Sequence, residues 1–318
     1  MNQIKKNLAH SIFQRLLNRA KSNKEDSNLL LSRYGMERFL YRLSVSPHND
    51  RFILKGASLF LVWKGQNYRV TRDADLLGLG ISDIKQLADL FREVCHVEFQ
   101  GDGMIYMPES LNAEEIREDQ EYDGVRITLI GMLNQARIPL QIDIGFGDAI
   151  TPAPEQIEYP TLFDAPPPLL KAYPRYTLVA EKVEAMIKLG LANSRMKDFY
   201  DIWLLSRLFS FEGNVLRKAL ENTFDRRRTT FPASTPFAFT PVFYEDPQKT
   251  VQWAAFVKKS KPDIPVGDLS AVIADIDAFL APLIESLQSN TPFKDAWVPD
   301  QGWGIRKGRH QKKTGLSG

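Results

Sequence analysis

The period of the hydrophobic pattern changes twice along this chain, and that restricts the folds open to it. Apolar residues between 7 and 45 recur at helical spacing, with a polar break at 21–28. Between 51 and 150 short apolar or alternating runs predominate, which is the pattern of strands. Helical spacing returns from residue 178 onward. We therefore expect an α+β fold, in which an N-terminal helical segment and a C-terminal helical domain flank a mixed sheet core.

Two segments mark boundaries in this order of elements. Residues 109–123 hold seven carboxylates against the single cation Arg117, which is typical of a solvated connection. The passage 151–176 is rich in proline and predicts the end of the sheet. On this basis the expected parts are N-terminal helices at 1–50, a core at 51–150, a helical domain at 151–303 and a basic tail at 304–318. We expect strands at 52–58, 69–77, 125–133 and 138–146, and helices at 59–63, 83–96, 178–209, 213–222, 248–259 and 268–288.

Composition excludes several classes of protein. No apolar run reaches the roughly 18–20 residues that span a bilayer, and the polar N-terminus lacks the apolar region of a signal peptide. Cys95 is the only cysteine, so an internal disulfide is excluded, and the four histidines are scattered, which argues against zinc. We expect a cytoplasmic protein with no membrane partner.

Asp73 and Asp75 are separated by one residue at the start of an apolar run. On a strand, residues i and i+2 point to the same face, so both carboxylates can converge on one point. Two neighbouring anions repel each other unless a cation neutralises them, and Mg²⁺ prefers oxygen ligands of this kind. The pair predicts a magnesium site, although isolated pairs of this spacing also occur by chance on surface strands.

Lys55-Gly56-Ala57-Ser58 lies at an expected strand-to-helix junction, about fifteen residues before Asp73. Small residues there let backbone N–H groups and the Ser58 hydroxyl approach phosphate oxygens. The alternative is a tight turn that needs Gly56 for its backbone conformation alone.

Asp143 interrupts an otherwise apolar strand. A buried carboxylate needs a hydrogen-bonded partner or a metal, unless it faces solvent. Placed beside the strand of Asp73 and Asp75, it would complete a two-metal site and could act as the general base.

Lys182 follows Val179 and precedes Met186 in a helical pattern, which directs its ammonium toward the core, where a phosphate ligand would explain it. Asp198 and Asp201 begin the next helical stretch, where aspartate is also a common cap. On the helix of Lys182, we interpret Glu181, Glu184 and Lys188 as ordinary surface charges.

In this order the residues resemble the AbiEii/AbiGii toxin family of nucleotidyltransferases, over roughly residues 8–230. The resemblance implies the DNA polymerase β-like nucleotidyltransferase core, two Mg²⁺ ions and a nucleoside triphosphate substrate. One position departs from the family, because Ala57 stands where a second glycine is usual and its methyl group could crowd the phosphate path. The matching motifs are Lys55-Gly56-x-Ser58, Arg69-x-Thr71-x-Asp73-x-Asp75, Ile142-Asp143-Ile144, Lys182 and Arg195-x-Lys197-Asp198-x-x-Asp201.

The resemblance also implies roles for these residues. Lys182 would steady the triphosphate or the acceptor, and Asp198 would orient that lysine or Arg195. The implied catalytic set is Asp73, Asp75, Lys182 and Asp198; the implied nucleotide-binding set is Gly56, Ser58, Lys182 and Arg195; the implied metal ligands are Asp73, Asp75 and Asp143.

For function, the resemblance implies a toxin of a toxin–antitoxin system, often linked to phage defence, whose partner is an antitoxin with a helix-turn-helix domain. Some members resemble enzymes that extend the 3′ acceptor end of tRNA, so tRNA is the expected acceptor and a block of translation the expected effect. Lys218, the run Arg226–Arg228 and the basic tail are candidate RNA contacts, or else solvated surface charges. Alternatives are a protein or small-molecule acceptor, or a non-catalytic binding protein, against which the intact set of site residues argues.

Overall fold

The computed structural model describes residues 3–66, 68–71, 73–80, 82–118 and 122–304. The chain forms two compact units, each treated by itself below. The first comprises Met1–Pro174 with Val257–Pro265, and the second comprises Arg175–Phe256 with Val266–Gly318. The expected basic tail lies, beyond Gly304, outside the described residues.

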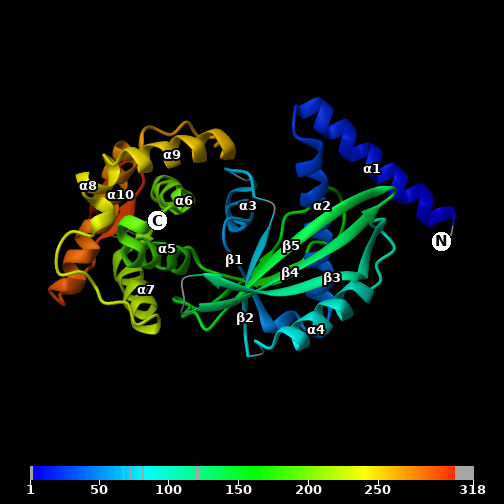
Figure 1. Cartoon of the computed structure of the whole chain (residues 1–318), viewed down its shortest axis with the longest axis horizontal. Helices are drawn as coiled ribbons and strands as arrows, with labels where there is room; N and C mark the ends of the chain where they lie inside the picture. Colours follow the sequence, from blue (N-terminus) through cyan, green and yellow to red (C-terminus); the bar gives the residue numbers. More distant parts are fainter. Residues whose placement is uncertain (1–2, 67, 72, 81, 119–121, 305–318) are drawn as a thin grey trace, which may run out of the picture. The chain divides into compact units, whose positions relative to one another are not determined.

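A seven-stranded mixed sheet forms the centre of the first unit (Figure 1). Its strands run in the order β3-β4-β5-β2-β1-β7-β6. The pairs β2–β5 and β1–β7 are parallel and the other pairs are antiparallel, so the expected mixed sheet is confirmed. The strands are β1 (Phe52–Lys55), β2 (Ala74–Gly78), β3 (Met104–Glu118), β4 (Tyr122–Leu133), β5 (Ala136–Phe146), β6 (Glu155–Glu158) and β7 (Leu169–Ala172).

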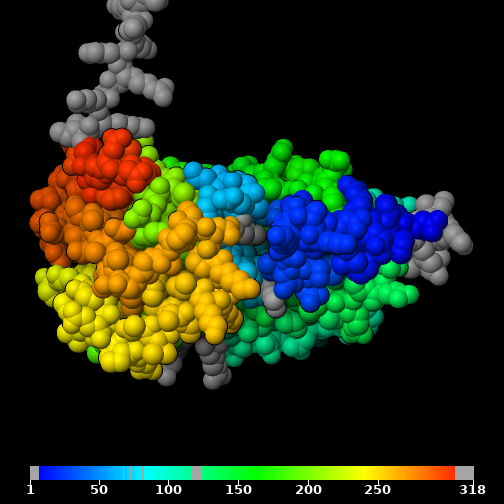
Figure 2. Space-filling model, turned by 90° about the horizontal axis from the view of Figure 1, so that it is seen from above, coloured from blue at the N-terminus to red at the C-terminus, as the bar shows by residue number. Residues whose placement is uncertain are grey.

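The helices of this unit begin where the sequence provides caps. Asp26 accepts hydrogen bonds from the backbone N–H groups of Asn28 and Leu29 at the start of α2, and Asp83 caps α4 through Gln86. The apolar face of α4 packs along β3 (Figure 1), while α1 and α2 form the blue surface of the space-filling view (Figure 2). The helices are α1 (Gln3–Asn23), α2 (Ser27–Val45), the 3₁₀ turn η1 (Asn49–Arg51), α3 (Leu59–Lys64) and α4 (Ile84–His96).

Two expectations about this unit are wrong. The acidic segment 109–123 is no loop: apart from the undescribed 119–121, it continues β3 and opens β4, which pair in a hairpin. Its charges are accommodated because strand residues such as Glu114 and Glu115 are exposed to solvent. The expected strands also omit β6 and β7, which the proline-rich passage 151–176 supplies. The sheet still ends inside that passage, at Ala172.

A buried ionic cluster that the sequence did not reveal joins α2 to the start of β3. Asp102 accepts hydrogen bonds from Arg38 at 3.1 Å and from Arg42 at 2.7 and 3.1 Å. Arg38 and Asp102 are fully buried, and such pairs must be satisfied in place because a lone buried charge is costly. The cluster thereby holds a long helix in one position on the sheet.

Helices dominate the second unit, as expected, and a small sheet of order β10-β9-β8 accompanies them. Aromatic rings around Phe279 fill its core, and the indoles of Trp297 and Trp303 donate to the backbone oxygens of Ser206 and Phe279. The elements are α5 (Arg175–Leu189), η2 (Gly190–Ala192), α6 (Met196–Leu208), β8 (Phe211–Glu212), α7 (Gly213–Arg226), η3 (Phe237–Phe239), α8 (Pro241–Tyr244), α9 (Pro247–Ser260), α10 (Leu269–Gln288), β9 (Ala296–Val298) and β10 (Gly302–Gly304). None of the helices in the described part of the chain has the length and apolar character needed to cross a membrane.

Candidate active site

Four charged residues form a row across neighbouring strands of the first unit. Arg126 on β4 pairs with Asp143 on β5, Asp143 pairs with Asp75 on β2, and Asp75 pairs with Lys55 on β1. Directly opposed residues on adjacent strands project from the same face of a sheet. The structure therefore brings Asp143 beside Asp75, as the sequence predicted, and places a cation at each end of the row.

Asp73 stands just before this row. The strand expected from residue 69 begins only at Ala74, so Asp73 is the residue that leads into β2. Asp73 is exposed, Ala74 is buried and Asp75 is half-buried, the alternation that is typical of an extended chain with both carboxylates on one side. The pKa of Arg126 is raised mainly by its hydrogen bonds to Asp143 and also by the charge of Asp73, so Asp73 lies within electrostatic reach of the row.

Gly56 is required by the position of Asp75. Its φ of +78° lies in the left-handed region, and a Cβ atom added there would fall 2.0 Å from Oδ2 of Asp75. The glycine is thus needed for its backbone conformation and for the space that the carboxylate occupies. Ser58, which is buried, donates from Oγ to the backbone oxygen of Lys55 at 3.3 Å and closes the turn.

Lys55 joins this turn to the end of β5. Its Nζ donates to Oδ2 of Asp148 at 2.9 Å and lies 5.5 Å from the centre of the Tyr173 ring. The Asp148 side chain is only 5% exposed, so the pair is held inside the protein. The sequence motif included Lys55 but gave no sign of Asp148, because their contact depends on the order of strands in the sheet.

Asp143 has a hydrogen-bonded partner, which is one of the possibilities that the sequence left open. Arg126 donates from Nε to Oδ1 and from Nη2 to Oδ2, both at 2.8 Å. Nε2 of Gln141 lies 3.2 Å from each of the same two oxygens. Sequence reasoning missed Arg126, although the two-residue turn Asn134-Gln135 could have revealed it. Pairing Leu133 with Ala136 across that turn fixes every later pair of the hairpin, including Arg126 with Asp143.

Asp73 and Asp75 are the residues that could hold a divalent cation. Asp73 and Asp75 offer the oxygen ligands that Mg²⁺ prefers, and Mg²⁺ usually keeps water and substrate phosphate in its other positions. Within the described residues, no group of three His, Cys, Asp or Glu side chains could hold a metal ion. The third predicted ligand, Asp143, is bound to a guanidinium instead.

In the second unit, Lys182 on α5 and two aspartates on α6 form a buried charged cluster. Nζ of Lys182 lies 2.6 Å from Oδ1 of Asp198 and 2.9 Å from Oδ2 of Asp201. Arg195 donates from Nε to the other oxygen of Asp198 at 2.8 Å. Burial alone would raise the pKa of Asp198, but the nearby Lys182 and Arg195 outweigh it and hold the pKa well below its usual range. Asp198 therefore contacts both cations that the family resemblance assigns to it.

Two interpretations of this region are wrong. Asp201 does not cap α6: it lies inside the helix, fully buried, one turn after Asp198, and both aspartates face Lys182. Glu181 and Glu184 are no surface charges either. Glu181 is buried and its Oε1 lies 3.8 Å from Nη2 of Arg227. The Glu184 side chain is 2% exposed and accepts from Arg227 at 2.7 Å and from Thr229. Arg227 is thus committed to an internal ion pair, which removes it from the candidate RNA contacts.

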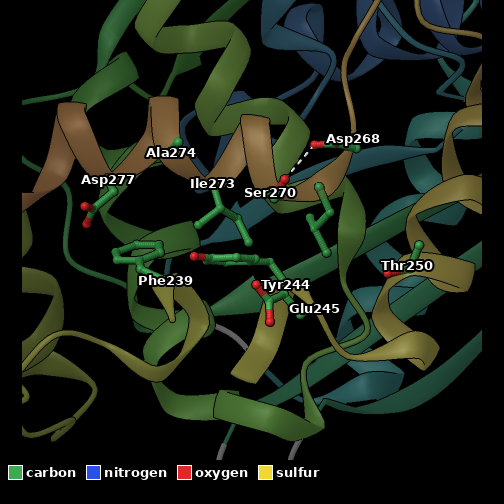
Figure 3. A pocket seen from close by; sticks show the side chains of 10 residues that line it. Phe239, Tyr244, Glu245, Thr250, Asp268, Ser270, Ile273, Ala274 and Asp277 are labelled. Carbon is green, nitrogen blue, oxygen red and sulfur yellow. Dashed lines mark hydrogen bonds between the residues drawn. The ribbon is translucent and has the colours of Figure 1, made fainter. Parts of the chain in front are cut away.

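A cavity of about 540 Å³ lies elsewhere in the second unit, between η3, α8, α9 and α10 (Figure 3). Its walls carry the carboxylates of Glu245, Asp268 and Asp277, and Asp268 already bonds Ser270 and the start of α10. The residues that line it include no lysine or arginine and none of the predicted site residues. An acidic cavity of this kind does not suit a triphosphate.

Comparisons with known proteins agree with the motif order. Residues 38–282 match the family described as nucleotidyl transferase AbiEii toxin, type IV toxin–antitoxin system. Two crystal structures from Helicobacter pylori also align, each at 15% identity and a TM-score of 0.47. One is JHP933, with 83% of this chain and 95% of that chain covered; the other is described as a proposed nucleotidyltransferase, with 84% and 100% covered. No curated protein matches the chain. The family match spans well over half of the sequence, and the chain therefore belongs to the AbiEii nucleotidyltransferase toxin family of type IV toxin–antitoxin systems.

Proposed function

We propose that this protein transfers a nucleotide from a nucleoside triphosphate to the 3′ acceptor end of tRNA, with Mg²⁺ as cofactor, and thereby blocks translation. The observation that carries the proposal is the register of Asp75 with Asp143, beside a glycine turn that leaves room for the carboxylate, in a chain of a nucleotidyltransferase family. A cognate antitoxin with a helix-turn-helix domain is the proposed partner.

The reaction needs a hydroxyl of the acceptor to attack the α-phosphorus while the bond from that phosphorus to the bridging oxygen breaks. Pyrophosphate leaves, and the hydroxyl proton passes to a base or to water. Mg²⁺, held by Asp73 and Asp75, would neutralise developing charge and favour the ionised hydroxyl. To act as the general base, Asp143 would first have to give up its hydrogen bonds to Arg126.

The second unit carries its own candidate phosphate contacts, Lys182 and Arg195. The Lys182 side chain is 10% exposed and forms ion pairs with two aspartates. The Arg195 side chain is 32% exposed. We assign phosphate contact chiefly to Arg195, with Lys182 and Asp198 as the groups that hold it in place. For the RNA acceptor, the exposed Lys218, Arg226 and Arg228 provide positive charge on this unit.

The test is transfer of label from each of four α-³²P nucleoside triphosphates to total tRNA in the presence of Mg²⁺. We expect one or two triphosphates to label tRNA, and we expect Asp73→Asn and Asp75→Asn to abolish the signal. Oxidation of the tRNA with periodate destroys the 3′-terminal diol and should abolish labelling as well. Labelling that survives periodate would contradict the acceptor end, and label found only in protein would replace RNA by a protein acceptor.

A further inference from the structure

Asp143, the third of the predicted metal ligands, is already paired with a cation. Arg126 is fixed opposite it by the hairpin register and donates one hydrogen bond to each of its oxygens at 2.8 Å. We propose that Arg126 takes the place of a second metal ion, so that the site binds a single divalent cation at Asp73 and Asp75. This proposal rests on the nucleotidyl transfer proposed above and goes beyond it by specifying the metal content.

The bonding capacity of Asp143 supports this assignment. A carboxylate offers about four lone-pair sites. Two of them accept from Arg126 in the bidentate geometry that makes guanidinium–carboxylate pairs strong, and the amide nitrogen of Gln141 lies 3.2 Å from both oxygens. A metal ion at Asp143 would have to displace donors that come from two strands.

Charge leads to the same conclusion. A guanidinium stays protonated at every pH that a protein tolerates, so Arg126 cannot release Asp143 by losing a proton. A second divalent cation on Asp143 would lie within a few ångströms of this permanent positive charge.

Arg126 can also supply part of what a second ion would supply. A guanidinium has five N–H donors, and the bonds to Asp143 use the one on Nε and one on Nη2. The Arg126 side chain is 34% exposed, so its remaining donors can reach a phosphate oxygen of the triphosphate. Arg126 is thus a fixed cation beside the single metal.

The competing explanation is a structural one, in which Arg126 and Asp143 are an ordinary cross-strand pair that separates when two metal ions bind. The two explanations differ in the number of ions bound. We would count Mn²⁺ bound to the full-length protein by electron paramagnetic resonance and calorimetry, with and without a non-hydrolysable nucleoside triphosphate analogue, for the wild type and for Asp143→Asn, Arg126→Met, Arg126→Lys and Asp75→Asn.

We expect one Mn²⁺ per wild-type chain, and an affinity that changes less than about twofold in Asp143→Asn. Arg126→Met frees Asp143 and should add a second ion or tighten binding at least about tenfold, while Arg126→Lys keeps the cation and the single ion. Two ions in the wild type, or loss of an ion in Asp143→Asn, would overturn the inference. These two counts need no change at Arg126, so they decide the question even if Arg126→Met fails to fold.

The experiment separates this inference from the proposed function. If the wild type binds no Mn²⁺, or Asp75→Asn binds as well as the wild type, the metal site itself is misassigned and the inference fails with it. If tRNA is not labelled but one Mn²⁺ is bound through Asp75, the acceptor is wrong and the single-ion site remains.

Discussion

The charged row of the first unit and the buried cluster of the second unit are built from the same kinds of group in different surroundings. In the row, the side chains of Arg126 and Asp143 are 34% and 24% exposed. In the cluster, Asp198 is 1% exposed and Asp201 is fully buried against Lys182. Exposed ion pairs contribute roughly 0–1 kcal/mol each, whereas a buried charge that loses its partner costs about 3–5 kcal/mol. The row is therefore open to solvent and to a ligand and contributes little to stability, whereas the cluster is part of the folded frame.

This difference teaches that the two regions should fail in different ways. A substitution in the row is expected to remove activity and leave the protein folded. A substitution in the cluster is expected to reduce stability first, so that any loss of activity must be measured on the folded fraction.

The largest expected effect is on catalysis, in Asp75→Asn. We expect the rate of nucleotidyl transfer to fall at least about 1,000-fold, since a metal ligand acts on the transition state and each tenfold corresponds to about 1.4 kcal/mol. The free energy of unfolding, measured with urea, should change by less than about 1 kcal/mol. A variant that lost stability instead would show that the row is structural and would remove the contrast.

Lys182→Met should have the largest effect on stability. It leaves Asp198 with Arg195 alone and Asp201 without the ammonium at 2.9 Å, so we expect the free energy of unfolding to fall by about 3–5 kcal/mol. Tryptophan fluorescence during urea unfolding reports on this unit, because four of the five tryptophans, Trp203, Trp253, Trp297 and Trp303, lie in it.

Lys188→Met is the matched control for that variant, since Lys188 lies on the same helix and is exposed. Its free energy of unfolding should stay within about 0.5 kcal/mol of the wild type. Equal losses in the two variants would mean that burial of the cluster does not set its importance.

The sequence was informative where chemistry depends on local spacing. The alternation around Asp73 and Asp75, the glycine turn at Gly56 and the helical pattern around Lys182 each predicted a local element that the structure contains. The order of these motifs predicted the family, and the family match over residues 38–282 confirms it.

What the sequence did not predict depends on contacts between distant elements. Asp148 meets Lys55 only because β5 and β1 flank β2, and Asp201 faces Lys182 only because α6 packs on α5. Charge also led to two wrong predictions, since the acidic segment 109–123 was assigned to a loop and Glu184 to the surface. Composition indicates the average exposure of a residue type, and it does not show which residue a given side chain will pair with. Arg126 was the exception, since the short hairpin turn could have paired it with Asp143.

A smaller effect, with a matched control, is expected when a methyl group is added at Gly56. Gly56→Ala forces a left-handed backbone on alanine, at about 1–2 kcal/mol, and drives its Cβ into the carboxylate of Asp75. Gly65 has a similar φ of +74° but, among the residues that the structure describes, no atom lies within 4 Å of the added Cβ, so Gly65→Ala carries the backbone cost alone. In urea unfolding we expect Gly56→Ala to lose at least as much stability as Gly65→Ala, and we expect only Gly56→Ala to lose activity, at least about tenfold. Equal activities would show that the position of Asp75 tolerates displacement.

The smallest effect is a dependence of stability on pH that belongs to the buried cluster. The folded protein holds the pKa of Asp198 well below the value of about 3.8 expected in the unfolded chain. Its contribution to stability is therefore complete above that value and is lost as the pH falls from there toward the folded pKa. Each pH unit in this window should cost up to about 1.4 kcal/mol, because only the unfolded chain binds the proton. Urea unfolding by tryptophan fluorescence between pH 5 and pH 2.5 should show this slope in the wild type and a shallower one in Asp198→Asn. Identical slopes would mean that the ammonium of Lys182 does not stabilise the charged form of Asp198, and the contrast between a buried cluster and a solvent-accessible row would then rest on burial alone.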